Sequence, residues 1–232
     1  MSDDLYVFAP GPGPSVPVAG EQLLFPVHRI YCVGQNYQEH AVEMGASGRE
    51  PPFFFGKPAD AVCLDAVLPF PPATENLHHE VELVIALAAG GSDIAPTEAL
   101  ERVYGYAVGV DLTRRDLQAA AKKQGRSWTT AKGFDRSAPI SAISPVARCG
   151  HPEHAAIRLA VNGDLRQSGN TAQMTWKIPE IIAELSRFFE LKAGDLVFTG
   201  TPAGVGPLLP GDHVECAIEG VGELAFDFGD KG

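Results

Sequence analysis

The chain has 232 residues, of which 45% are hydrophobic and 20% are charged, so it carries enough apolar material for one large domain with its own core. Its formal net charge of −11 weighs against nucleic acid or an anionic membrane surface as a partner. The four cysteines form no C-x-x-C pair, the first residues are acidic, and the longest apolar run, 83–89, is too short to cross a bilayer. We therefore expect a soluble cytoplasmic protein.

The N-terminal segment, residues 1–26, combines a Pro/Gly-rich stretch with short apolar pieces. These pieces, 16–18 and 23–25, are too apolar for a free tail, which predicts an arm packed on the body. Residues 27–232 contain no internal repeat and no linker, so we expect them to form a single domain. The first element of that domain is a buried strand at 29–34.

His40 and Glu43 follow this strand and stand three residues apart, so on a helical turn they share a face. Glycines and prolines at 45–52 have the composition of a mobile loop. A carboxylate that orients an imidazole and raises its basicity is a general-base arrangement, here carried on a lid. A solvated pair on a surface helix is the simpler interpretation of these residues alone.

Residues 52–58 predict an apolar strand that ends in a lysine, and its three consecutive phenylalanines suggest a core position. The stretch 78–85 also predicts a strand. Because side chains alternate along a strand, Glu80 and Glu82 lie on one face with His78 beside them. Two carboxylates without an adjacent lysine or arginine repel each other, so a divalent cation between them is one interpretation. An ordinary exposed strand face is the alternative.

A short helix at 96–104 and a strand at 106–111 come next, and the strand ends in Asp111. A Thr-x-x-Asp pattern predicts that a helix begins at Thr113. Asp111 would then lie at a strand-to-helix junction, a common place for ligating groups. Arg115 and Gln118 share a face of this helix. Lys132 lies in a segment with little helical or strand periodicity, and the default expectation is that it is a surface lysine.

The C-terminal half predicts mainly strands. Asn162-Gly163 indicates a two-residue hairpin turn, and an amphipathic helix begins at Ile178-Pro179, with Phe189 on its apolar face. A strand at 195–199 leads into the Gly/Thr-rich turn 200–206, which offers N–H groups and hydroxyls to an anion. This turn lacks the lysine and the spacing of a P-loop. Two further strands, 213–218 and 223–228, close a β-rich body.

Several of these segments together resemble the fumarylacetoacetate hydrolase family over about residues 28–228, and within it the bacterial fumarylpyruvate hydrolases and acylpyruvases. The order and joint presence of the motifs make the resemblance specific. They are Cys32-Val33-Gly34-x-Asn36-Tyr37, His40-x-x-Glu43-Met44-Gly45, His78-His79-Glu80-Val81-Glu82-Leu83, Asp111-Leu112-Thr113-x-Arg115-Asp116-x-Gln118, Ala131-Lys132-x-Phe134-Asp135, Val161-Asn162-Gly163 and Thr199-Gly200-Thr201-Pro202-x-Gly204-Val205-Gly206.

The resemblance implies an α+β, β-rich fold, a mixed β-sandwich roll with a few peripheral helices, that forms the catalytic domain and is usually found as a homodimer. It also implies Mg²⁺ or Mn²⁺ held by Glu80, Glu82 and Asp111, and three carboxylates without a cysteine do make a hard site suited to these ions. One departure is Gln35, where the family often has arginine. Its loss removes one possible contact to a substrate anion or to the lid.

The implied reaction is metal-dependent hydrolysis of a C–C bond in a 2,4-dioxo acid, foremost fumarylpyruvate in gentisate-type aromatic degradation. His40, oriented by Glu43, would deprotonate the water, and Lys132 with Gln118 would stabilise the oxyanion. Arg115 and the Thr201 turn could bind the carboxylate ends of the substrate. The alternatives are acylpyruvase action, decarboxylation of oxaloacetate or isomerisation of a related dioxo acid on the same site, and a metal-binding protein without turnover.

Overall fold

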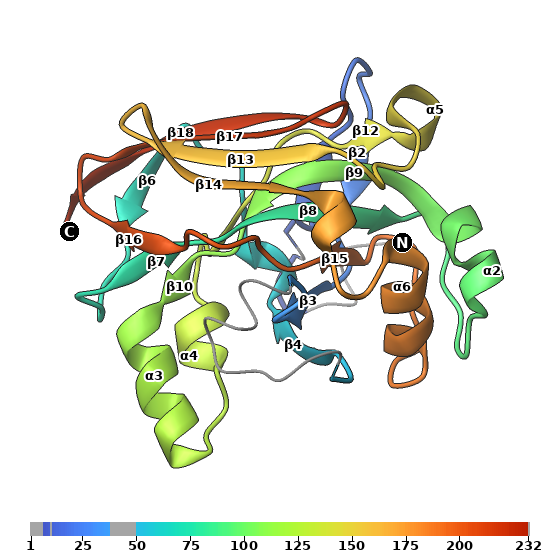
Figure 1. Cartoon of the computed structure of the whole chain (residues 1–232), viewed down its shortest axis with the longest axis horizontal. Coiled ribbons are helices and arrows are strands. Elements are labelled where there is room, and N and C mark those ends of the chain that lie inside the picture. Colours follow the sequence, from blue (N-terminus) through green and yellow to red (C-terminus); the bar gives the residue numbers. More distant parts are fainter. Residues whose placement is uncertain (1–6, 10, 38–49, 232) are drawn as a thin grey trace.

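Two long antiparallel strands, β8 (Val81–Leu87) and β9 (Val103–Val110), form the centre of the molecule. The computed structural model describes residues 7–9, 11–37 and 50–231 (Figure 1). Every residue of β8 is buried. A strand that is covered on both faces needs a nearly continuous apolar run, and the second half of β8 supplies one.

These strands belong to a six-stranded mixed sheet with the order β12-β9-β8-β15-β3-β4. In it β15 runs antiparallel to β8 and parallel to β3. The other members are β12 (Ser144–Pro145), β15 (Leu196–Phe198), β3 (Ile30–Gly34) and β4 (Phe53–Lys57).

A five-stranded sheet with the order β14-β13-β17-β18-β6 lies across one face of the first (Figure 1). The main core fills the space between the two sheets and includes Leu83, Ile85, Leu159 and Phe226. The strands are β14 (Asp164–Asn170), β13 (Ala156–Val161), β17 (His213–Ile218), β18 (Gly222–Lys231) and β6 (Val67–Phe70).

Short strands complete the sheet structure, and one pair of them carries a second core. β1 (Ser15–Pro17) pairs with β2 (Leu24–Pro26), and Val16 and Phe25 are buried in the same cluster as Ile30 and Val84. The remaining short strands are β10 (Thr113–Arg114), β7 (Leu77–His79) and β16 (Gly206–Leu208) in one sheet, and β11 (Ala138–Pro139) with β5 (Val62–Cys63) in another.

The helices are short and lie at the periphery. Two of them, α3 and α4, gather at one end of the molecule, while α2 and α6 pack together at the other (Figure 1). None of the helices in the described part of the chain is long and apolar enough to span a membrane. They are α2 (Pro96–Ala99), α3 (Arg115–Gln124), α4 (Thr129–Lys132), α5 (Val146–Cys149), α6 (Ile178–Ser186) and the single 3-10 turns Ala59–Ala61, Leu100–Arg102 and Thr171–Gln173.

The predicted fold class, a β-rich mixed sandwich with a few peripheral helices, is confirmed. The hairpin turn is confirmed as well, because Asn162 and Gly163 connect β13 to β14 with φ angles of 53° and 82°. Left-handed values at both central residues define the turn type that matches the twist of two antiparallel strands.

Several predicted boundaries are wrong. The strand expected at 78–85 is two strands in different sheets, with Glu80 in the gap between β7 and β8. The helix expected from Thr113 begins at Arg115, because Thr113 and Arg114 pair with β7 instead. The helix α6 ends at Ser186, so Phe189 lies beyond it and is 41% exposed.

Candidate active site

Three buried carboxylates meet where β8 begins and β9 ends. Val81 lies opposite Val110 in the ladder, and the N–H of Asp111 donates to the carbonyl of Glu80 at 2.9 Å. This register places Glu80 and Glu82 beside Asp111, which follows β9 directly. One oxygen of each carboxylate lies within 4.8 Å of an oxygen of the other two, and all three residues are buried.

Cationic side chains from three other elements surround two of these acids. Lys132 Nζ, at the end of α4, donates to Glu80 Oε2 at 3.0 Å and to Asp111 Oδ2 at 2.6 Å. Lys57 Nζ, at the end of β4, lies 2.8 Å from Asp111 Oδ1 in an ionic contact that is not aligned as a hydrogen bond. Arg115 pairs with Glu80 Oε1. Burial opposes the charge of Lys132, but Asp111 and Glu80 hold the pKa of this lysine above its usual value.

Glu82 is the acid with the least compensation. Within the described part of the chain, no lysine or arginine lies within ion-pair distance of it, and its Oε2 accepts a hydrogen bond from the Gly200 N–H at 2.7 Å. Burial, together with the charges of Asp111 and Glu80, raises the pKa of Glu82 well above its ordinary value. A bound divalent cation would supply the positive charge that Glu82 lacks.

The Gly200 turn is built for this contact. Gly200 has φ +95°, and a Cβ at this position would lie 2.8 Å from Asn36 Cβ. Only glycine adopts such a conformation without strain, and it lets the backbone approach the carboxylate. The residues present therefore fit Mg²⁺ or Mn²⁺: the donors are hard carboxylate oxygens, they lie close together, and one of them is left without a cation.

A narrow cleft opens beside the carboxylates and encloses about 30 Å³. Its walls come from the end of β3, from β4, from α3 and α4, and from the turn after β15. The lining residues are Val33, Gly34, Gln35, Phe53, Phe55, Glu80, Glu82, Arg115, Gln118, Trp128, Lys132, Gly200 and Thr201.

Two expectations about side-chain environment are wrong. Lys132 is not a surface lysine but is 2% exposed, because its charge is balanced by two buried acids. The phenylalanines of β4 do not enter the core as a group. Phe53 is 38% exposed, and both it and Phe55 line the cleft.

The structure also brings together the residues expected to bind substrate. Arg115 Nη1 donates to Gln118 Oε1 at 2.6 Å, and both residues face the cleft. The Thr201 hydroxyl donates to the Val81 carbonyl and accepts from Gln167 Nε2, each at 2.7 Å, so it is already engaged by the protein. His40 and Glu43 lie outside the described residues, and their roles stay predictions.

His78, whose environment the sequence leaves open, lies against Arg115, whose Nε donates to His78 Nδ1 at 3.4 Å. Burial, and then the charge of Arg115, lower the pKa of His78 to about 4, so the ring is neutral at pH 7 and can accept this hydrogen bond. The contact helps to hold the guanidinium beside Glu80.

Two residues that shape the site are not predicted by the sequence. Lys57 is one of them, and the signal that could have found it was a charged residue at the end of an otherwise apolar strand. The second, Gln167, is fully buried in β14. Its Oε1 accepts from the Val81 N–H at 3.1 Å and its Nε2 donates to the Pro202 carbonyl at 2.8 Å, which ties the turn after β15 to β8. No periodicity marks a buried glutamine in a polar strand.

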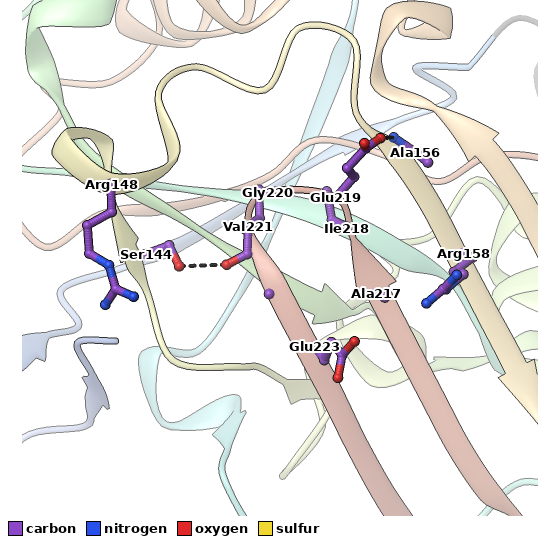
Figure 2. Close-up of a pocket in the computed structure, with 11 residues that line it drawn as sticks. Ser144, Arg148, Ala156, Arg158, Ala217, Ile218, Glu219, Gly220, Val221 and Glu223 are labelled. Atoms are coloured by element: carbon purple, nitrogen blue, oxygen red, sulfur yellow. Dashed lines mark hydrogen bonds between the residues drawn. The ribbon is translucent and has the colours of Figure 1, made fainter. Parts of the chain in front are cut away.

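A larger open groove of about 540 Å³ lies elsewhere, around the β17–β18 hairpin. Figure 2 shows that Ser144 points toward the Val221 carbonyl and Glu219 toward the Ala156 amide. The Ser144 hydroxyl donates to the Val221 carbonyl at 2.5 Å, and the Ala156 N–H donates to Glu219 Oε2 at 3.3 Å. These hydrogen bonds join β12 and β13 to the β17–β18 hairpin. Arg148 and Arg158 share the groove with Glu219 and Glu223, and none of the groove's lining residues belongs to the carboxylate cluster.

The family model described as fumarylacetoacetate (FAA) hydrolase C-terminal matches residues 29–228. The chain belongs to this family. This confirms the resemblance seen in the sequence motifs.

Individual relatives in the family carry two different activities. Oxaloacetate tautomerase of Escherichia coli is 44% identical over 203 residues, which cover 87% of this chain and 93% of the relative. The mitochondrial oxaloacetate tautomerase of Mus musculus is 42% identical over 198 residues, 85% and 90% of the two chains. A crystal structure of fumarylpyruvate hydrolase from Pseudomonas aeruginosa in complex with Mn²⁺ and pyruvate is 50% identical, with a TM-score of 0.93 over 97% of this chain and 99% of the other.

The expected divalent-cation cofactor is confirmed by two findings together: the structural relative contains Mn²⁺, and this chain has the carboxylate cluster suited to hold such an ion.

Proposed function

We propose that the chain is a metal-dependent hydrolase that cleaves a C–C bond in a 2,4-dioxo acid, converting fumarylpyruvate and water to fumarate and pyruvate. The observation that carries the proposal is the buried cluster of Glu80, Glu82 and Asp111 on a scaffold so similar to the P. aeruginosa fumarylpyruvate hydrolase. That structure holds pyruvate, which is one product of this reaction.

The three carboxylates would hold the divalent cation. When bound, this ion acts as a Lewis acid and as a template for the substrate's α-keto acid end. Arg115 binds the carboxylate of that end. Its guanidinium has five N–H donors, of which three serve His78, Gln118 and Glu80, so two remain for the substrate.

Lys132, assisted by Gln118, stabilises the negative charge that develops on the C4 oxygen. An ammonium has three donors, and Glu80 and Asp111 use two of them. The third is available to the substrate. Because the ammonium is buried, its attraction for an oxyanion is screened less than it would be in water.

His40, oriented by Glu43, takes a proton from the attacking water as the water oxygen bonds to C4. The C3–C4 bond then breaks, its electron pair passes to C3, and C3 is protonated to give pyruvate, while the acyl group leaves as fumarate. This assignment is supported by the sequence motif His40-x-x-Glu43-Met44-Gly45 and by general-base chemistry.

A substrate panel tests the proposal. Fumarylpyruvate, acetylpyruvate and oxaloacetate are incubated with the protein and Mg²⁺ or Mn²⁺, with and without EDTA, and the products are separated by chromatography. We expect equal amounts of fumarate and pyruvate from fumarylpyruvate, with this conversion abolished by EDTA. If no dioxo acid is cleaved, the hydrolase proposal fails and a metal-binding protein without turnover becomes the better account.

A second candidate is oxaloacetate chemistry, which the activities of the E. coli and mouse relatives favour. Tautomerisation moves a proton between carbon and oxygen and needs no attacking water, whereas decarboxylation releases CO₂ and pyruvate. Faster keto–enol exchange of oxaloacetate, measured by its ultraviolet absorbance, would identify the first. Carbon dioxide release would identify the second.

Two further proposals rest on the sequence. We propose that the chain forms a homodimer, as the family resemblance implies, and light scattering in solution tests this. We also propose that residues 1–26 act as an arm on a catalytic domain of residues 27–232, for which the burial of Val16 and Phe25 is the structural support.

A further inference from the structure

The space beside the carboxylates is too small for the proposed substrate. Its volume is about 30 Å³, far below the range of small-molecule sites. A cavity of about 380 Å³ adjoins it, and four side chains line both spaces: Phe53, Phe55, Trp128 and Lys132. The larger cavity is in the size range of small-molecule sites. Most of a seven-carbon dioxo acid must therefore lie outside the inner cleft, along these shared side chains.

The three aromatic rings form one contiguous group. The centroids of Phe53 and Trp128 are 5.3 Å apart with the rings edge to face, and those of Phe55 and Trp128 are 5.7 Å apart. Such contacts fix the rings against one another. Lys132 Nζ lies 5.2 Å from the centroid of Phe55. An acyl group attached to a carbonyl carbon at Lys132 consequently leads onto this aromatic surface.

The wall of the larger cavity also contains a cation that does not line the inner cleft. Arg126 lines the larger cavity and is exposed, and within the described ranges its guanidinium has no carboxylate partner. The protein carries a net charge of −11, so an unpaired arginine at a cavity wall provides local attraction for an anion that the molecule as a whole repels.

We infer that Phe53, Phe55 and Trp128 form the subsite for the acyl group of the substrate, and that Arg126 recognises a carboxylate at the far end of that group. The class of substrate that fits is a 2,4-dioxo acid whose acyl group is flat, conjugated and terminated by a carboxylate. The inference rests on the proposed function and deepens it, because it names the feature that separates fumarylpyruvate from the shorter acetylpyruvate.

The first test compares kcat/KM for these two substrates. Arg126→Gln removes the charge, and a charge-assisted hydrogen bond is worth enough for a loss of about 10-fold or more on fumarylpyruvate. Acetylpyruvate has no carboxylate on its acyl group to bind Arg126, so its kcat/KM is expected to fall less than about twofold. Lys123→Gln is the matched control, because this exposed lysine lies on the neighbouring end of α3 but does not line the cavity.

Trp128→Leu tests the aromatic surface. Leucine keeps an apolar side chain but removes the flat face, so fumarylpyruvate should lose about 10-fold in kcat/KM and acetylpyruvate clearly less, since stacking of a planar group on an aromatic ring is lost. An equal loss on both substrates would mean a structural role only and would overturn the assignment of Trp128.

A binding measurement separates this inference from the reaction itself. Fumarate and crotonate, which share the planar double bond but differ in the second carboxylate, are titrated by calorimetry into the Mg²⁺-loaded protein. We expect fumarate to bind more tightly to the wild type and this preference to vanish in Arg126→Gln. That result upholds the subsite even if no dioxo acid is cleaved, in which case only the proposed reaction fails. Equal affinities in the wild type would overturn the subsite.

Discussion

At the scale of single residues, two lysines hold the two oxygens of Asp111. Lys57 and Lys132 come from different elements and are both almost completely buried. Together with Arg115 they balance the three carboxylates in formal charge, so a divalent cation would leave the site with a net positive charge. A substrate with two carboxylates complements that charge.

Removing Lys57 should destabilise the protein. Lys57→Met keeps the length of the side chain but leaves a buried carboxylate oxygen without its cation, which typically costs about 3 kcal/mol or more. Urea unfolding in EDTA measures this loss. Lys192→Met is the control, because Lys192 is half exposed and its contact with Glu190 is 3.6 Å long, so it should change stability by less than about 0.5 kcal/mol. Equal effects of the two substitutions would contradict the role of Lys57.

Replacing a carboxylate should weaken metal binding without loss of the fold. Glu82→Gln removes one charged ligand, and because Glu82 lacks a cationic partner within the described residues, the metal-free protein should lose little stability. Calorimetric titration with Mn²⁺ should show an affinity about 10-fold lower or worse, a loss typical of disturbed metal sites. Unchanged affinity would remove Glu82 from the ligand set.

His40→Ala should reduce turnover by about 10²-fold or more, because general-base catalysis contributes at least that much. Metal affinity should survive, since the carboxylate cluster is built from other elements. Steady-state kinetics and Mn²⁺ titration on the same preparation separate the two effects. Turnover equal to that of the wild type would exclude His40 from the mechanism.

At the scale of elements, the break between β7 and β8 organises the site. β7 pairs with β10 and β16, whereas β8 pairs with β9 and β15. Glu80 lies in the gap, where the chain passes from one sheet to the other, and its carbonyl accepts the Asp111 N–H. The gap brings two acids from one segment and a third from another to one point, and β4, α3 and α4 then supply the cations.

The hairpin turn gives a prediction at this scale. Gly163 has φ +82°, and no atom lies within 4 Å of the point that a Cβ would occupy. Gly163→Ala should therefore lower the free energy of unfolding by about 1 kcal/mol through backbone strain alone. Gly13→Ala is the control, because Gly13 also has open space around it but no positive φ. Chemical denaturation of the two variants checks the difference. Equal stabilities would rule out strain at the turn.

At the scale of the whole molecule, the metal site joins parts of the chain that are far apart. Glu82 lies in β8 and Asp111 directly after β9. This central pair of strands packs against the five-stranded sheet on one face and against the β1–β2 cluster on the other. An ion held only by the folded arrangement therefore stabilises the molecule as a unit.

Mn²⁺ should raise the thermal midpoint, and EDTA should reverse the rise. At a free concentration about 100 times the Kd, binding adds about 2.7 kcal/mol, which for a chain of this size is a shift of about 5–10 °C. Differential scanning calorimetry measures it, and Glu82→Gln should show a smaller shift. A midpoint that is independent of Mn²⁺ in the wild type would contradict a specific site.

The sequence by itself determined the strands with clear alternation, the Asn162-Gly163 turn, the fold class and the set of three carboxylates. The strands and the turn follow from local periodicity and turn chemistry, whereas the fold class and the carboxylate set follow from the resemblance of the sequence motifs to a known family. Only the tertiary structure decided what surrounds the carboxylates. Lys132 is 52 residues from Glu80 and 21 from Asp111, and each of these ions is tolerated in the interior only because the others are there. Local pattern predicts which way a side chain points, but the partner that makes its burial possible is fixed by packing across sheets.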